Sequence, residues 1–240
     1  MTAFHETIER EFPGAVPMAD FLADLKATIE PLGFTDDRTL PLVSICRDEL
    51  TTAFFDLIQQ DWGPAFTLAG LGGVPALGRT GWAAALSHVP DVDGRGGVLV
   101  FGFPHIGIEA DGTVGTTIRS GQDQPTSTCG AVSSIWQAAQ DGTLPTEVDF
   151  DDFEATRLAL RIVDPTRTPP PTLVDLTVAT LDAVEIDLWK ALDDAEVWRT
   201  HDVTVWCGVQ IHGHGLLDWV WPRDAWYCGA DGHRRKVPTT

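Results

Sequence analysis

Short apolar runs that alternate with segments of helical periodicity constrain the fold of this chain more than any other feature. Three segments have the composition of strands: 39–46 (TLPLVSIC), 97–104 (GVLVFGFP) and 201–215 (HDVTVWCGVQIHGHG). Apolar residues recur at helical spacing in the segments 17–31, 47–62, 149–163 and 172–195. Strands that alternate with helices predict an α/β fold with a mixed or parallel central sheet flanked by helices, in which ligands gather at the carboxyl ends of strands.

The length of 240 residues suits one domain with a sizeable core. We predict a single α/β domain over residues 1–240, with N-terminal helices at about 1–38. A proline-rich connector at about 164–171 is expected to be stiff and extended between two of the helical segments.

The charge of the chain limits its partners. Acidic residues outnumber basic residues by 35 to 16, which gives a formal net charge of -19. Such a chain repels nucleic acids and anionic membrane surfaces, so we expect neither as a partner. No stretch approaches about 18 uninterrupted apolar residues, and the N-terminus lacks the basic and then apolar order of a signal peptide. We expect a soluble protein of the cytoplasm.

The four cysteines lie far apart, with no CxxC pair. Buried thiols or metal ligands are therefore a better interpretation than disulfide bonds. Cys46 lies at a predicted strand-to-helix turn, His105 follows the next strand, and Cys129 opens a predicted helix. Two thiolates and one imidazole suit Zn²⁺, and three protein ligands would leave an open position for water or substrate, as in catalytic sites.

Other interpretations of these side chains stay open. The spacing of the three residues matches no short zinc signature, so Cys46 and Cys129 could be buried small hydrophobic side chains and His105 a hydrogen-bonded turn residue.

A second group of ligand-type side chains could form a closed structural zinc site. Its members are Cys207, His212, His214 and Cys228. The odd separation of Cys207 and His212 places them on opposite faces of a regular strand, which favours ordinary strand residues.

Six motifs follow one another between about residues 40 and 220. They are CRDE at 46–49, LAGLGGVPALGRTG at 68–81, SHVPD at 87–91, FPHIGI at 103–108, STCGA at 127–131 and GVQIHG at 208–213. As a set they resemble the limiting-carbon-dioxide-inducible protein B family, which is similar in fold to β-type carbonic anhydrases and is sometimes described as the theta type. The resemblance implies a β-carbonic-anhydrase-like α/β fold, assembled as a homodimer.

The resemblance also implies a metal site and a reaction. Zn²⁺ would be held by Cys46, His105 and Cys129, and zinc-bound hydroxide would hydrate carbon dioxide reversibly to bicarbonate and a proton.

Asp48 matches an aspartate of the β-type enzymes that ligates zinc in only one of two states. There an aspartate pairs with an arginine to leave the fourth zinc position to water, and it ligates zinc when the pair breaks. Leu50 stands where the β-type CxDxR motif has its arginine. We rank Arg47 first as the partner of Asp48 and Arg79 second, with Arg119 as the third candidate; each could instead be a surface arginine.

Further residues are assigned to proton transfer and to the pocket. His88 is the candidate proton shuttle, because imidazole titrates near neutral pH, although a histidine near a helix C-terminus can also serve the helix dipole. Gly72, Gly73, Arg79 and Gly81 are expected to line the substrate pocket, although turn geometry alone would explain the glycines.

The leading function is therefore a zinc carbonic anhydrase that acts on carbon dioxide and bicarbonate. The alternative is a non-catalytic zinc-containing member that senses bicarbonate or carbon dioxide or serves as a partner subunit, which the missing CxDxR arginine favours. A zinc hydrolase for another small substrate would share the metal-hydroxide chemistry, but the sequence shows no obvious substrate-binding insertion.

Overall fold

Four parallel strands form the centre of the fold. The computed structural model describes residues 2–164 and 170–239. The central strands lie side by side in the order β3 (Phe66–Thr67), β2 (Thr39–Ile45), β4 (Gly96–Phe103) and β8 (His201–His212). Because they run parallel, their carboxyl ends meet at one edge of the sheet.

The long strand β8 changes its neighbours along its length. After β4, the short strand β5 (His105–Gly107) continues parallel to β8. Pro104 separates β4 from β5, because proline has no N–H to donate to the ladder. On its other side β8 pairs antiparallel with β10 (Ala225–Cys228) and with β9 (Trp219–Pro222).

Short strands complete the edges of the structure. β11 (Arg234–Val237) pairs with β10, and β1 (Val16–Pro17) pairs with β9. A separate two-stranded ribbon consists of β6 (Thr116–Thr117) and β7 (Thr126–Ser127).

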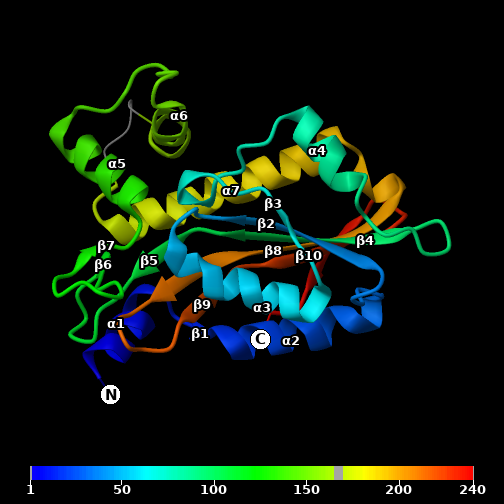
Figure 1. Cartoon of the computed structure of the whole chain (residues 1–240), viewed down its shortest axis with the longest axis horizontal. Helices are drawn as coiled ribbons and strands as arrows, with labels where there is room; N and C mark the ends of the chain where they lie inside the picture. Colours follow the sequence, from blue (N-terminus) through cyan, green and yellow to red (C-terminus); the bar gives the residue numbers. More distant parts are fainter. Residues whose placement is uncertain (1, 165–169, 240) are drawn as a thin grey trace.

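Helices cover both faces of the sheet (Figure 1). One face carries α4 (Arg79–Leu86), α5 (Gly130–Asp141), α6 (Phe153–Ile162) and α7 (Leu173–Asp194). The opposite face carries α2 (Met18–Ile29) and α3 (Thr52–Trp62), while α1 (Ala3–Glu11) packs against β9. The predicted α/β class, with a mixed and mostly parallel central sheet flanked by helices, is confirmed. Within the described residues, no helix combines the length and the apolarity needed to cross a membrane.

Side chains on β4 alternate between two hydrophobic cores. Val98 and Val100 pack on the side of α7, whereas Leu99 and Phe101 pack on the side of α2 and α3. Every residue of β4 is buried, which explains why this strand reads as a continuous apolar run. Each such side chain contributes about 1.5–3 kcal/mol by leaving water.

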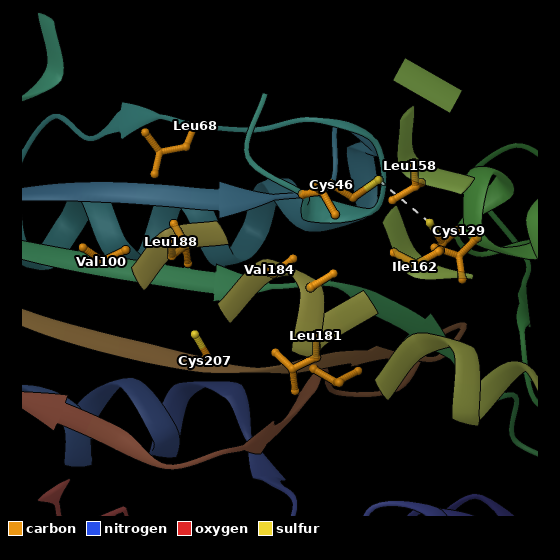
Figure 2. Close-up of a cluster of buried hydrophobic side chains, with 14 of the residues drawn as sticks. Cys46, Leu68, Val100, Cys129, Leu158, Ile162, Leu181, Val184, Leu188 and Cys207 are labelled. Carbon is orange, nitrogen blue, oxygen red and sulfur yellow. Dashed lines mark hydrogen bonds between the residues drawn. The ribbon is translucent and has the colours of Figure 1, made fainter. Parts of the chain in front are cut away.

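Gly102 lets α7 approach the sheet closely. A Cβ atom at this position would lie 2.7 Å from Leu188, 2.8 Å from Val184 and 3.0 Å from the sulfur of Cys207. Figure 2 shows Val184 and Leu188 of α7 directly above the strands, with Cys207 beside them.

Two details differ from the sequence-based expectation. The helix expected directly after Cys46 begins only at Thr52, because the Asp48 carboxylate accepts the N–H of Leu50 at 3.1 Å and caps a short 3₁₀ turn, η2 (Glu49–Thr51). His105, expected in a turn beyond a strand, opens β5.

The proline-rich connector predicted at about 164–171 falls largely on residues 165–169, which lie outside the described residues. The single-domain organisation stays a prediction.

Candidate metal centre

Three buried ligand-type side chains come from three elements at the carboxyl edge of the sheet. Cys46 follows the last residue of β2, and His105 opens β5. Because Ile45 and Phe103 are register partners in the parallel pair of β2 and β4, Cys46 and His105 lie at the same level along the strands. Cys129 is the N-cap residue of α5.

The ligand atoms of these residues converge. The sulfur atoms of Cys46 and Cys129 are 4.0 Å apart (Figure 2), and all three ligand atoms lie within 4.8 Å of one another. Cys46 and Cys129 are each 5% exposed, and His105 is 1% exposed. In the part of the chain that the structure describes, no other group of three or more His, Cys, Asp or Glu residues gathers in this way.

The two thiols differ in acidity because they share one hydrogen bond. The Cys129 thiol donates to the sulfur of Cys46, and this lowers the pKa of Cys46 far below its ordinary value. His105 and the backbone N–H of Asp48 lower that pKa further, although burial opposes them. The same interaction and burial raise the pKa of Cys129. A bound cation would favour the thiolate form of both.

The surroundings of His105 fit a metal ion. Both of its ring nitrogens are buried, and neither has a hydrogen-bond partner among the described residues. An unpartnered buried imidazole is costly, and coordination of one nitrogen would remove part of that cost. Two sulfurs and one imidazole nitrogen form a donor set that suits Zn²⁺. The chain can therefore hold a metal ion here.

Asp48 is paired with Arg119, which lies in the loop between β6 and β7. The distance from Nη2 of Arg119 to Oδ2 of Asp48 is 2.8 Å. The same Nη2 donates to the carbonyl of Thr128 at 2.8 Å, and Nη1 donates to the carbonyl of Ser127 at 2.9 Å. The arginine is thus fixed by the segment that leads into Cys129, and it holds the Asp48 carboxylate in turn.

This arrangement corrects the ranking of the candidate arginines. Arg47 follows Cys46 directly, but its side chain turns outward and pairs with Glu154 of α6. Neighbouring side chains on an extended segment point in different directions, so Arg47 does not reach Asp48 although the two are adjacent in the sequence. Arg79 lies on the first turn of α4 and does not pair with Asp48.

A hollow of about 680 Å³ opens beside the candidate ligands. Cys46, Arg47 and Asp48 line it together with apolar side chains such as Phe55 and Leu68. Phe153 and Glu154 of α6 form part of its wall. It offers both polar anchoring groups and an apolar surface.

The predicted pocket glycines divide into two groups. Gly73 has φ +80°, and a Cβ atom on it would lie 3.3 Å from the carbonyl oxygen of Phe103 and 3.5 Å from the backbone nitrogen of Cys46. Gly72, with φ +63°, packs against Leu158. Gly73 therefore lies directly behind Cys46, but neither glycine, nor Arg79, is among the residues that line the hollow. Gly81 of α4 lies against Leu77, which precedes the helix, and the structure does not bring Gly81 to the candidate ligands.

His88 lies away from the candidate ligands. It is exposed after the end of α4, and its ring packs against Phe66 of β3 with the centroids 5.7 Å apart. Phe66 is the register partner of Leu42, four residues before Cys46. The structure does not place this imidazole in the hollow beside the cysteines.

The second group of Cys and His residues does not come together. Cys207 points toward α7, whereas Cys228 pairs with Val203 in the sheet. Nδ1 of His214 donates a hydrogen bond to the carbonyl of Ile118, 2.8 Å away. Cys207, Cys228 and His214 are ordinary strand and turn residues, as the alternative interpretation expected.

His212, which the sequence placed in this second group, lies beside the first group of candidate ligands instead. Its ring packs edge-on against His105 with the centroids 5.4 Å apart. Nδ1 of His212 lies 3.1 Å from the carboxylate of Asp218, and burial lowers its pKa. The parallel register of β5 and β8, which pairs Gly107 with His212, creates this contact. The GVQIHG motif contains His212, but the sequence alone does not bring it beside His105.

Comparison with known proteins agrees with the fold and with the motifs. A family model described as limiting CO2-inducible proteins B/C β carbonic anhydrases matches residues 15–228. The crystal structure of the limiting CO2-inducible protein LCIB shares 27% sequence identity, over 98% of this chain and 99% of that chain, with a TM-score of 0.78. No curated protein sequence matches the chain.

Two further crystal structures share the fold. PtLCIB4, a homolog of LCIB, has 24% identity and a TM-score of 0.81 over 97% of this chain and 99% of that chain. A mutant of PtLCIB4 has 24% identity and a TM-score of 0.83 over 98% of both chains. The resemblance drawn from the six motifs is confirmed.

Proposed function

Because the chain belongs to the family of limiting CO2-inducible proteins B/C β carbonic anhydrases, we propose that it catalyses the reversible hydration of carbon dioxide to bicarbonate. The observation that carries this proposal is the pairing of Asp48 with Arg119 beside the buried cluster of Cys46, His105 and Cys129. A carboxylate held by an arginine next to a three-ligand site leaves a fourth position free for water or substrate.

The metal of this reaction is proposed to be zinc. Cys46, His105 and Cys129 would hold it, and it would supply a hydroxide at neutral pH by lowering the pKa of a bound water to about 7. This assignment rests on the donor set and on the unpartnered nitrogens of His105.

The residues of the chain supply orientation and a low-polarity surface. Arg119 holds Oδ2 of Asp48 and the N–H of Leu50 holds Oδ1, so both carboxylate oxygens are engaged within the protein. Phe55 and Leu68 give the hollow an apolar wall that suits carbon dioxide, which is uncharged.

The alternative, a non-catalytic zinc protein that senses bicarbonate or carbon dioxide, drew its support from the missing CxDxR arginine. Arg119 provides an arginine for Asp48 from a different part of the chain. The alternative therefore has no specific observation in its favour, and it becomes one outcome of the test.

The test measures carbon dioxide hydration by stopped flow and zinc content on the same purified sample. We expect turnover with about one zinc per chain, and loss of both in Cys46→Ala. Zinc near one per chain without turnover would support the sensor. If the Cys46→Ala variant hydrated carbon dioxide as fast as the wild type does, the proposed site would be wrong.

A further inference from the structure

A second hollow of about 620 Å³ lies between α4, α6 and α7. Figure 1 shows α4 and α6 above α7, on the same side of the sheet. Among the described residues, Leu77 alone lines both this cleft and the hollow beside Cys46. The cleft is therefore a separate site, and the proposed hydration reaction does not use it.

The charges in this cleft are unusual for the molecule. Among the residues that the structure describes, Arg79 and Arg157 are the two lysine or arginine residues that have no carboxylate partner, and both line the cleft. The chain carries 35 acidic residues against 16 basic ones, so available carboxylates are abundant. Two guanidinium groups without a carboxylate partner that line one cleft of such a molecule indicate an anion supplied from outside.

The two acidic residues in the cleft do not neutralise these arginines. Asp187 is paired with Arg161, and Asp194 is paired with Lys190. The cleft therefore keeps a local excess of positive charge.

The backbone around the arginines is also arranged for an anion. Nη1 of Arg157 donates to the carbonyl of Pro75 at 3.0 Å, which fixes the half-buried guanidinium and leaves its other N–H groups available. Arg79 is the first residue of α4, whose N-cap residue Gly78 also lines the cleft. This helix start has no side-chain cap and no acidic residue in its first turn, so its free N–H groups and its dipole favour a negative charge.

The remaining lining is apolar. Trp82, Leu86 and Ala191 form much of the wall, together with Leu77 and Ala83. A cleft that combines an apolar wall with a few convergent cations suits an organic molecule better than an inorganic ion.

We propose that this cleft binds a small organic anion, whose carboxylate or phosphate pairs with Arg79 and Arg157 and whose apolar part lies against Trp82 and Leu86.

The test uses two fluorescent probes that share one aromatic skeleton. 8-Anilinonaphthalene-1-sulfonate carries an anionic group, and N-phenyl-1-naphthylamine lacks it. Each is titrated into the wild-type protein, into Arg79→Gln, into Arg157→Gln and into the control Arg235→Gln. The control removes an exposed arginine that is paired with Asp231 outside the cleft. Thermal unfolding of each variant checks that the fold is kept.

We expect saturable binding of the anionic probe that weakens at least about 10-fold in Arg79→Gln, where the exposed side chain makes no contact that the fold needs. Arg157→Gln should weaken it similarly, and Arg235→Gln should leave it unchanged. The neutral probe should bind all four proteins alike. Displacement by benzoate and by phenyl phosphate then distinguishes a carboxylate ligand from a phosphate ligand. Equal affinity of the anionic probe for the wild type and for a folded Arg79→Gln protein would overturn the proposal.

Discussion

Arg119 controls the position of the Asp48 carboxylate, although 71 residues separate the two in the chain. Replacing it as Arg119→Gln removes a charge-assisted hydrogen bond worth about 1.5–3 kcal/mol. The freed carboxylate can then turn toward the metal cluster and compete with water. We expect carbon dioxide hydration to fall roughly 10- to 100-fold with zinc content unchanged, measured by stopped flow and metal analysis.

Arg47→Gln is the matched control for that experiment, because Arg47 is adjacent to Asp48 but pairs with Glu154. The ion pair between Arg47 and Glu154 is exposed and contributes little to stability, so the variant should keep its fold. The rate of carbon dioxide hydration by Arg47→Gln should therefore stay within a few-fold of the wild-type rate. If Arg47→Gln lost as much activity as Arg119→Gln, the gating role would not belong to the Asp48–Arg119 pair.

The cysteines allow a second comparison at this scale. Cys129→Ser replaces a thiolate ligand with a weak hydroxyl ligand, and we expect zinc to fall from about one per chain to near zero. Cys207→Ser changes a cysteine that is equally buried but packs against α7, and it should keep its zinc. Metal analysis after dialysis against a mild chelator measures both, and full zinc retention in Cys129→Ser would remove Cys129 from the site.

Sequence reasoning could place Cys46, His105 and Cys129 together because each follows a strand or opens a helix at the same edge of a parallel sheet. It could not identify the partner of Asp48. The guanidinium of Arg119 reaches that carboxylate through a loop whose path depends on tertiary packing, and no local pattern in the chain records the contact.

At the scale of the elements, Gly102 of β4 controls how closely α7 can approach. Gly102→Ala places a Cβ within 3.0 Å of Leu188, Val184 and Cys207, so the helix must move outward. We expect a loss of about 1–3 kcal/mol in the free energy of unfolding, measured by urea denaturation. Gly130→Ala, whose Cβ meets no atom within 4 Å and lies in the first turn of α5, is the control and should not lower the free energy of unfolding. A fully stable Gly102→Ala protein would mean that α7 is not packed as described.

Glu185 of α7 gives a prediction about pH. Burial raises the pKa of its carboxyl group, although Arg223 opposes this effect. The folded state therefore binds the proton more tightly than the unfolded state, so this group favours folding at low pH. That contribution is lost as the pH rises from the unfolded value of about 4.3 through the raised folded value.

Glu185→Gln removes this titration. The melting temperature of the variant relative to the wild type should therefore increase between about pH 4 and pH 7. Differential scanning calorimetry at several pH values measures this difference, with the exposed substitution Glu147→Gln as the reference. A relative melting temperature that decreases over the same interval would contradict the assignment of burial as the dominant cause.

The elements themselves were largely predictable, because their apolar spacing reflects burial in the two cores. Their ends were less so. The delayed start of α3 at Thr52 depends on the Asp48 side chain, which caps a 3₁₀ turn in place of the helix. The continuation of β4 into β5 depends on pairing with β8, which lies about 100 residues away in the chain.

At the scale of the whole molecule, the formal net charge is -19. Nearly all lysine and arginine side chains in the described residues pair with carboxylates. The expectation that the protein binds neither nucleic acid nor anionic membranes follows from this charge and stays a prediction. The homodimer that the family resemblance implies also stays a prediction, and the surface near the metal cluster offers a reason for it.

That surface carries two exposed aromatic side chains. Phe150 is 86% exposed and Phe153 is 44% exposed, and their rings stack with the centroids 6.3 Å apart. Phe153 also lines the hollow beside Cys46. Exposed aromatic pairs of this kind are typical of interface anchors, because burying them against a partner removes a large apolar surface from water.

We therefore expect sedimentation equilibrium to give twice the chain mass of 26.0 kDa, and we expect Phe150→Asp to shift the protein toward the monomer by placing a charge in the contact. Ile186→Asp is the control, because Ile186 is 57% exposed on α7, outside the hollow that Phe153 lines, and should leave the mass unchanged. A wild-type protein that sediments as a monomer at micromolar concentration would exclude the dimer. A dimer that persists in Phe150→Asp but dissociates in Ile186→Asp would place the interface on α7, and the mouth of the metal hollow would then face solvent.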